Sequence, residues 1–197
     1  MSATILLSIM AASMAVPQSS TVFADAALAP RNSDGIAIVK LFVAPDREVL
    51  ACRVVASGLS EADNDRVCDK LVGKRAGEAA RGPDGQAAYG TMTYVVAGSG
   101  TRGSAELEAN LPADITLDVK SLPGGAKSTS VNLNLLLDAS GKVAKCEGSR
   151  YSSDSYVTAA CASLKDQVLD VRKGSDGNPV SYVDSVNVDF VSRQAGL

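Results

Sequence analysis

The sequence contains no histidine and no tryptophan, and aromatic residues make up only 4% of its 197 residues. Without histidine the chain lacks the usual general base, the usual partner of a nucleophilic serine or cysteine, and the commonest metal ligand. The four cysteines include no C-x-x-C pair, so a zinc site is not indicated either. The sequence therefore predicts a protein that is not an enzyme and has no catalytic residues, bound metal or cofactor.

Two further catalytic or binding motifs are missing or incomplete. No serine stands three residues before a lysine, which excludes the S-x-x-K arrangement. Gly98–Gly103 matches G-x-G-x-x-G, but a dinucleotide site needs a helix directly after this motif. The next segment, Ser104–Leu111, shows no apolar period and stops at Pro112, so we interpret it as part of a linker. A hydrolase that uses carboxylates alone is the least favoured function class.

The chain also lacks an excess of positive charge. Its 19 basic and 22 acidic residues are spread along the sequence and give a net charge of −3. Proteins that bind nucleic acid or anionic membranes carry a basic patch, so neither partner is expected. Hydrophobic residues make up 46% and charged residues 21%, which is typical of a globular protein with a core of valine, leucine, isoleucine and alanine.

The first 24 residues carry no charge at all. Thr4–Val16 is apolar but shorter than the roughly 20 residues that cross a bilayer, as in the central region of a signal peptide. Val22–Ala24 supplies a small-residue cleavage site, although a lysine or arginine at the N-terminus is missing, and a buried N-terminal helix is the alternative. We expect residues 1–24 to be a signal peptide, and the mature chain to enter the periplasm without a membrane span.

The cysteines form two groups, Cys52 with Cys68 and Cys146 with Cys161, and their number alone allows three pairings. The same order of features surrounds each group. The first cysteines are 94 residues apart, the second cysteines 93, and the Asp-Gly pairs that follow 92. We infer an internal duplication of about 60 residues. The shared positions predict Cys52–Cys68 and Cys146–Cys161 disulfides in an oxidising compartment, with four buried free thiols as the alternative.

Each copy has the pattern of strand, turn, strand, helix, turn and strand. In the second copy Val131–Leu137 alternates like a half-buried strand, and Val157–Val168 carries one apolar helical face. In the first copy Ser60 and Asp63 form a capping pair at the start of the helix. The predicted fold class is α+β, with two tandem ββαβ modules that each contain an antiparallel sheet and one helix.

The first strand, Ile36–Val43, is apolar on both faces. A strand with this pattern is covered on both sides in a folded protein. A single ββαβ layer leaves one sheet face bare, so we expect the two halves to pack together or to share a sheet.

These features resemble the C-terminal domain of TonB, the periplasmic end of a bacterial energy transducer, and most closely its cysteine-bearing alphaproteobacterial forms. The resemblance covers residues 36–97 and 130–193. The matching motifs are Arg47–Val54 and Asp84-Gly85 in the first copy, and Ser140–Cys146 and Asp176–Val180 in the second. The family's aromatic and Pro-Ala pair before the Asp-Gly turn is absent, as are the transducer's membrane anchor and Pro-rich spacer.

The resemblance implies TonB-C-like modules at residues 25–97 and 130–197, joined by a linker at 98–129 that contains one strand. It also implies a non-enzymatic periplasmic protein that binds a protein or peptide partner by strand addition, with a link to TonB-dependent transport. The alternative is a structural envelope protein that self-associates, for example as a homodimer, through the same sheet edges.

The resemblance also indicates where a partner strand binds. In this family the last strand often lies near a sheet edge, so Ala88–Val96 and Val180–Val191 are the expected edge strands. Thr93 and Asn187 are therefore the predicted partner-binding edge positions. Proline cannot donate to a strand ladder, so proline at either position is expected to block strand addition without emptying the core.

Overall fold

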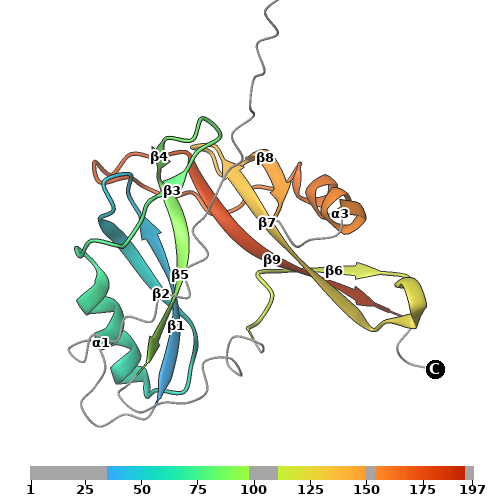
Figure 1. The fold of residues 1–197 in the computed structure, drawn as a ribbon, viewed down its shortest axis with the longest axis horizontal. Coiled ribbons are helices and arrows are strands. Elements are labelled where there is room, and N and C mark those ends of the chain that lie inside the picture. Colours follow the sequence, from blue (N-terminus) through green and yellow to red (C-terminus); the bar gives the residue numbers. More distant parts are fainter. Residues whose placement is uncertain (1–34, 98–110, 150–153, 194–197) are drawn as a thin grey trace, which may run out of the picture.

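The computed structural model describes residues 35–97, 111–149 and 154–193, and its fold is α+β (Figure 1). The expected signal peptide at 1–24 and the Gly98–Gly103 motif lie outside the described residues. None of the described helices is long and apolar enough to cross a membrane.

The described elements fall into two halves along the chain. The first half contains β1 (Ile36–Val43), β2 (Val49–Ser57), α1 (Glu61–Leu71), β3 (Ala80–Arg81), β4 (Ala87–Ala88) and β5 (Gly90–Ala97). The second half contains β6 (Ile115–Val119), the 3-10 helix η1 (Pro123–Gly125), β7 (Ser128–Leu137), β8 (Val143–Gly148), α3 (Asp154–Leu164) and β9 (Tyr182–Ser192).

Seven of the described strands form one sheet in the order β2-β1-β5-β9-β7-β8, and β6 also pairs with β9. The pairs within each half are antiparallel except β6–β9, while β5 and β9 pair in parallel. The halves therefore share one sheet rather than forming two separate ones. Figure 1 shows β5 and β9 lying side by side at one end and diverging along their length.

The two halves use the same local turns. The Ala44 N–H donates to the Glu48 carbonyl over 2.8 Å, and the Asp138 N–H donates to the Lys142 carbonyl over 2.9 Å, 94 positions later. In each turn one residue has a positive φ, 77° at Arg47 and 82° at Gly141. Only glycine adopts this conformation without a steric cost. The turn in the first half thus has the same geometry, although Arg47 stands where the second half has glycine.

The two helices cover opposite faces of the sheet. The odd-numbered residues of β1, such as Val39 and Leu41, cluster with Val67 of α1. Phe42 points to the other face, because successive side chains alternate along a strand, and it clusters with Leu164 of α3. The expectation that β1 is covered on both sides is confirmed, since seven of its eight residues are buried.

The predicted helix cap is present at α1. The Ser60 side chain accepts a hydrogen bond from the Asp63 N–H, and its hydroxyl donates to the Asp63 carboxylate over 2.8 Å. This pair satisfies one of the unpaired N–H groups in the first turn. Helix α1 therefore begins where the sequence predicts it.

Candidate functional site: the junction and the open sheet edges

The two halves meet where β5 and β9 begin. Among the described residues the register between these strands contains the single pair Gly90↔Val183, and the Val183 N–H donates to the Tyr89 carbonyl over 2.9 Å. A Cβ atom at Gly90 would lie 2.9 Å from the Val183 carbonyl oxygen and closer still to the Ala80 side chain. The approach of the two strands thus requires a residue without a side chain.

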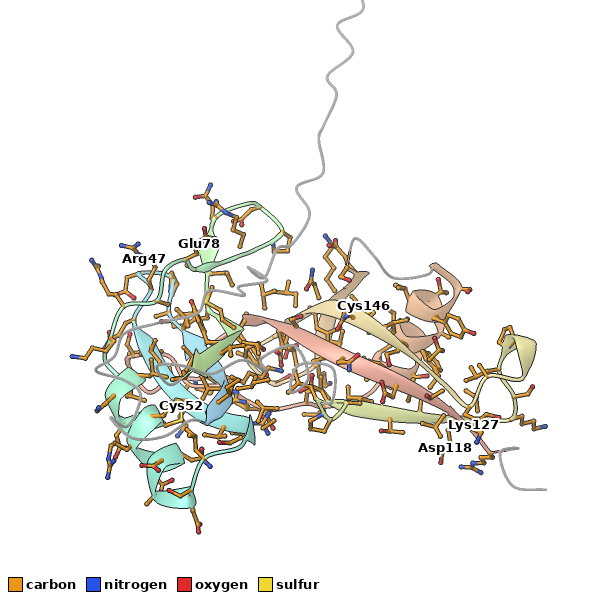
Figure 2. The ribbon with its side chains drawn as sticks, turned by 60° about the horizontal axis from the view of Figure 1, so that its bottom comes forward. Arg47, Cys52, Glu78, Asp118, Lys127 and Cys146 are labelled. Atoms are coloured by element: carbon orange, nitrogen blue, oxygen red, sulfur yellow. A yellow bond between two sulfur atoms is a disulfide. The ribbon has the colours of Figure 1, made fainter. Side chains whose placement is uncertain are left out.

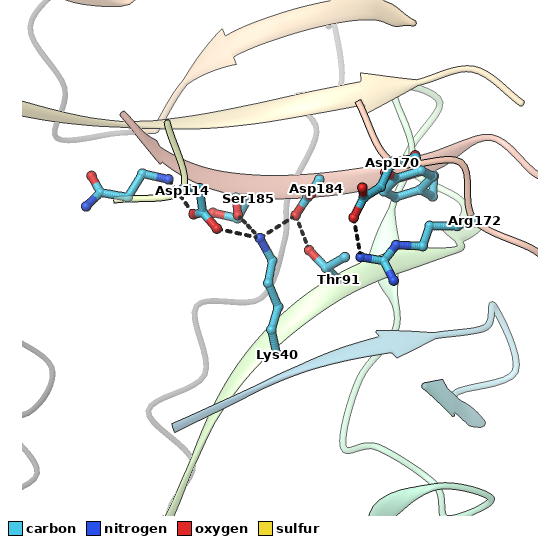
Figure 3. A network of polar contacts seen from close by, with 9 residues as sticks. Lys40, Thr91, Asp114, Asp170, Arg172, Asp184 and Ser185 are labelled. Carbon is cyan, nitrogen blue, oxygen red and sulfur yellow. Dashed lines mark hydrogen bonds and ion pairs between the residues drawn. The ribbon is translucent and has the colours of Figure 1, made fainter. Parts of the chain in front are cut away.

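Beyond the contact between Gly90 and Val183, a network of polar side chains links the diverging strands (Figure 3). The Lys40 Nζ lies 3.0 Å from the Asp184 carboxylate and 3.3 Å from the Asp114 carboxylate, and it donates to the Ser185 carbonyl over 3.1 Å. Thr91 donates to the same Asp184 carboxylate. Only 10% of the Lys40 side chain and 14% of the Asp184 side chain are exposed. The Lys40 ammonium group thus joins β1 to β9 and to Asp114, and Thr91 of β5 enters the network through the Asp184 carboxylate.

Aromatic residues pack beside the network. Phe42 stacks on Tyr89 at 5.9 Å between ring centroids and meets Tyr182 edge-on at 5.7 Å, while the Arg172 guanidinium lies 5.9 Å from the Phe42 centroid. The Tyr182 hydroxyl donates to the Asp170 carbonyl over 2.7 Å. Burial, together with the nearby Asp184 carboxylate, raises the pKa of Tyr182 to about 12. This phenol therefore stays protonated and serves as a hydrogen-bond donor at neutral pH.

The carboxylates of this protein serve structural roles where the geometry is clear. Hydrogen bonds from the Ser140 side chain and from the Lys142 backbone N–H lower the pKa of Asp138. Hydrogen bonds from the side chain and backbone of Asn178 lower the pKa of Asp176 in the same way. Both carboxylates accept bonds within turns. Within the described ranges no three His, Cys, Asp or Glu residues are grouped so as to hold a metal ion.

The two predicted partner-binding positions do not lie on edge strands of the sheet. Asn187 is on β9, between β7 and β6, and faces Asn132 of β7. On its other side the Asn187 N–H donates to the Asp114 carboxylate and its carbonyl accepts from the Asp114 N–H, both over 2.9 Å. Thr93 is on β5, which lies between β1 and β9, and it faces Lys40. The expectation that the closing strands are edges is wrong for β9, which is paired on both sides, whereas β5 pairs with β9 at Gly90 alone among the described residues.

The ends of the sheet order are β2 and β8. Each is linked to the helix beside it, β2 to α1 through Cys52–Cys68 and β8 to α3 through Cys146–Cys161, with Cα–Cα distances of 5.3 Å and 5.7 Å. The predicted pairing of the cysteines is thereby confirmed. Figure 2 shows Cys52 and Cys146 in the two different halves of the molecule. The disulfides thus anchor both outer strands of the sheet.

The direction of the backbone groups on β2 follows from its register with β1. The Gly58 N–H donates to the Ile36 carbonyl, so even-numbered β1 residues bond to β2. Val54 stands opposite Val39, an odd-numbered residue, and its N–H and carbonyl therefore point away from β1. No described strand pairs with β2 on that side. Val54 thus presents backbone groups of the kind that accept an added strand.

Sequence reasoning overlooked the Lys40 network. The available signal was one lysine in a strand that is otherwise apolar on both faces, since such a charge must find a partner when the strand is buried. The partners could not be found in the same way, because Asp114 and Asp184 lie 74 and 144 residues further along the chain.

Comparisons with protein-family models, with curated proteins and with solved structures found no match to this chain.

Proposed function

We propose that this is an exported, non-enzymatic protein of the periplasm that binds a protein or peptide partner by strand addition. The proposal rests on β2, an edge strand that no described strand pairs with on one side. The Cys52–Cys68 disulfide anchors this strand to α1. An anchored edge strand offers a rigid template of N–H and carbonyl groups to an extended peptide. The disulfides favour an oxidising compartment, which agrees with export.

The proposal extends the resemblance to the TonB C-terminal domain, but it assigns partner binding to a different strand. Partner binding is assigned to β2 rather than to the closing strands, because β5 and β9 bind each other at Gly90 and Val183. A link to TonB-dependent transport remains part of the proposal, since the partner of such a domain is an extended envelope peptide.

Substitution of Val54 tests this proposal. Val54→Pro removes the N–H on the open side of β2, so we expect capture of the envelope partner in a crosslinking pull-down to be abolished. Val54→Ala loses a similar part of the packing against the α1 cluster but keeps the N–H, and it is expected to capture the partner normally. Both variants must show intact disulfides and similar thermal melting.

A photo-crosslinking residue gives an independent readout. Arg53 is exposed on β2, and Asp65 is exposed on α1. The crosslinker at position 53 should label the partner strongly and the crosslinker at position 65 weakly. Equal labelling at both positions, or full capture by folded Val54→Pro, would show that strand addition at β2 is wrong.

A further inference from the structure

The opposite end of the sheet has a charge pattern that is complementary to itself. The Ser149 N–H donates to the Asn132 carbonyl over 2.9 Å, so residues 147 and 145 bond to β7 and Cys146 and Gly148 direct their backbone groups to the open side. An antiparallel partner strand centred on Cys146 would bond reciprocally with this residue. If that strand is β8 of a second copy, Lys145 of each copy stands directly opposite Glu147 of the other copy.

The side chains of Lys145 and Glu147 lie on the same face of β8, so this register would bring those of the two copies together. Cys146 points toward α3, to which its disulfide binds it, so Lys145 and Glu147 lie on the opposite face of β8. They form an ion pair within one chain and are 40% and 27% exposed. In the paired arrangement each lysine would lie between its own Glu147 and the Glu147 of the second copy. Opposite charges at directly facing positions stabilise antiparallel strand pairs.

Helix α3 leaves room for a second copy. It packs over β8, since a Cβ atom at Gly148 would contact Val157, and over β7 through Leu164. Neighbouring strands are about 4.8 Å apart, so the two copies of α3 would be separated by roughly 8–10 Å, the usual distance of packed helices. Among Ser155–Leu164, the part of α3 whose burial is described, the exposed residues are short and uncharged; they are Ser155, Thr158, Ala159, Ala162 and Ser163.

The β2 edge has neither the complementary charges of β8 nor a neighbouring helix with an uncharged surface. A strand pair centred on Cys52 would place Ala51 opposite Arg53, which gives no charge complement. Helix α1 would also bring a mainly acidic surface of the two copies together, with Glu61, Asp65 and Asp69 exposed beside one exposed basic residue, Arg66. Since like charges oppose such an approach, the β2 and β8 edges are suited to different partners.

We propose that β8 pairs with β8 of a second copy about a two-fold axis at Cys146, and that the protein is a homodimer with one continuous sheet. This deepens the proposed function, because a second copy is then the strand partner at β8 while the two β2 edges stay open at the ends of the dimer. The interface is isologous, as in most dimers.

Charge reversal provides the test, with the disulfide-bonded protein measured by sedimentation over a range of concentrations. The wild type should show a monomer–dimer equilibrium. Lys145→Glu and Glu147→Lys should each weaken the dimer about tenfold or more, because two attractive pairs become repulsive. The double variant K145E/E147K should dimerise like the wild type, since it restores opposite charges at both pairs.

The outcomes separate this inference from the proposed function. A monomeric wild type at all concentrations, single variants that dimerise normally, or a double variant that stays weak would each overturn the β8 dimer. Melting curves of all variants, measured at a concentration too low for dimers to form, should be similar, because both side chains are partly exposed. Partner capture through β2 is measured separately with Val54→Pro, and it can fail or succeed whatever the sedimentation result.

Discussion

Single residues in this protein have roles that depend on their distant neighbours. Lys40 is a charged residue in a buried strand, and it is tolerated because two carboxylates and a carbonyl surround its ammonium group. Removing one partner of such a group costs more than the pair contributes, since the remaining charges stay buried. We therefore expect the Lys40 network to contribute more to the arrangement of the two halves than to the net stability of the fold.

Tyr182 gives the protein a predicted sensitivity to alkaline pH. Its folded-state pKa is raised from 10.0 to about 12, so the folded protein favours the neutral phenol. The associated stability is fully present below pH 10 and is lost as the pH rises from 10 through 12. An absorbance titration of tyrosine ionisation should show a late step to which Tyr182 contributes.

Tyr182→Phe should reduce the late step of this titration and flatten the loss of stability above pH 10. Tyr156→Phe is the matched control, since Tyr156 packs against Phe190 on the same core, and it should leave the late step in place. A late step of unchanged size in Tyr182→Phe would contradict the assignment.

At the scale of elements, the position of β9 inside the sheet changes the expected effect of proline at Asn187. Asn187 was predicted to tolerate proline, but its N–H donates to the Asp114 carboxylate and its strand is paired on both sides. Proline removes this donor and leaves an acceptor without its partner. The strand therefore behaves as a central strand of the sheet.

Asn187→Pro should lower the free energy of unfolding by about 1–3 kcal/mol or prevent folding, as measured by chemical denaturation. Asn187→Ala keeps the backbone donor and is the control, with a smaller expected effect. If Asn187→Pro melted like the wild type, the pairing around Asp114 would be wrong.

The whole molecule depends on a narrow contact between its two halves. Phe42 from β1 belongs to the same core cluster as Leu164 of α3, and the backbones of the halves meet at Gly90 and Val183. Because the halves share both a core and a sheet, a change at their contact is expected to affect the stability of both.

Gly90→Ala should lower the free energy of unfolding by about 1–3 kcal/mol, because the added Cβ would collide with Ala80 and with the Val183 carbonyl. Gly77→Ala is the matched control, since a Cβ there meets nothing within 4 Å, and it should change stability by at most about 0.5 kcal/mol. Equal effects of the two substitutions in denaturant titrations would refute the close contact.

Properties that depend on short stretches of chain could be predicted from the sequence. The α+β class, the cap at Ser60, the turns at Asp84-Gly85 and Asp176-Gly177 and both disulfides follow from local periods and repeated spacings. Such features use residues that are near in sequence or share a place in a repeated pattern, so the pattern itself carries the information.

The order of the strands, and with it the candidate binding edges, was decided by the tertiary structure. Strands pair through backbone groups that every residue carries, so nothing in Thr93 or Asn187 distinguishes an edge from a centre. Gly90 and the partners of Lys40 acquire their roles only when β5 and β9 come together. The sequence by itself determined which elements form, and the packing of the two halves determined which of them remain open to a partner.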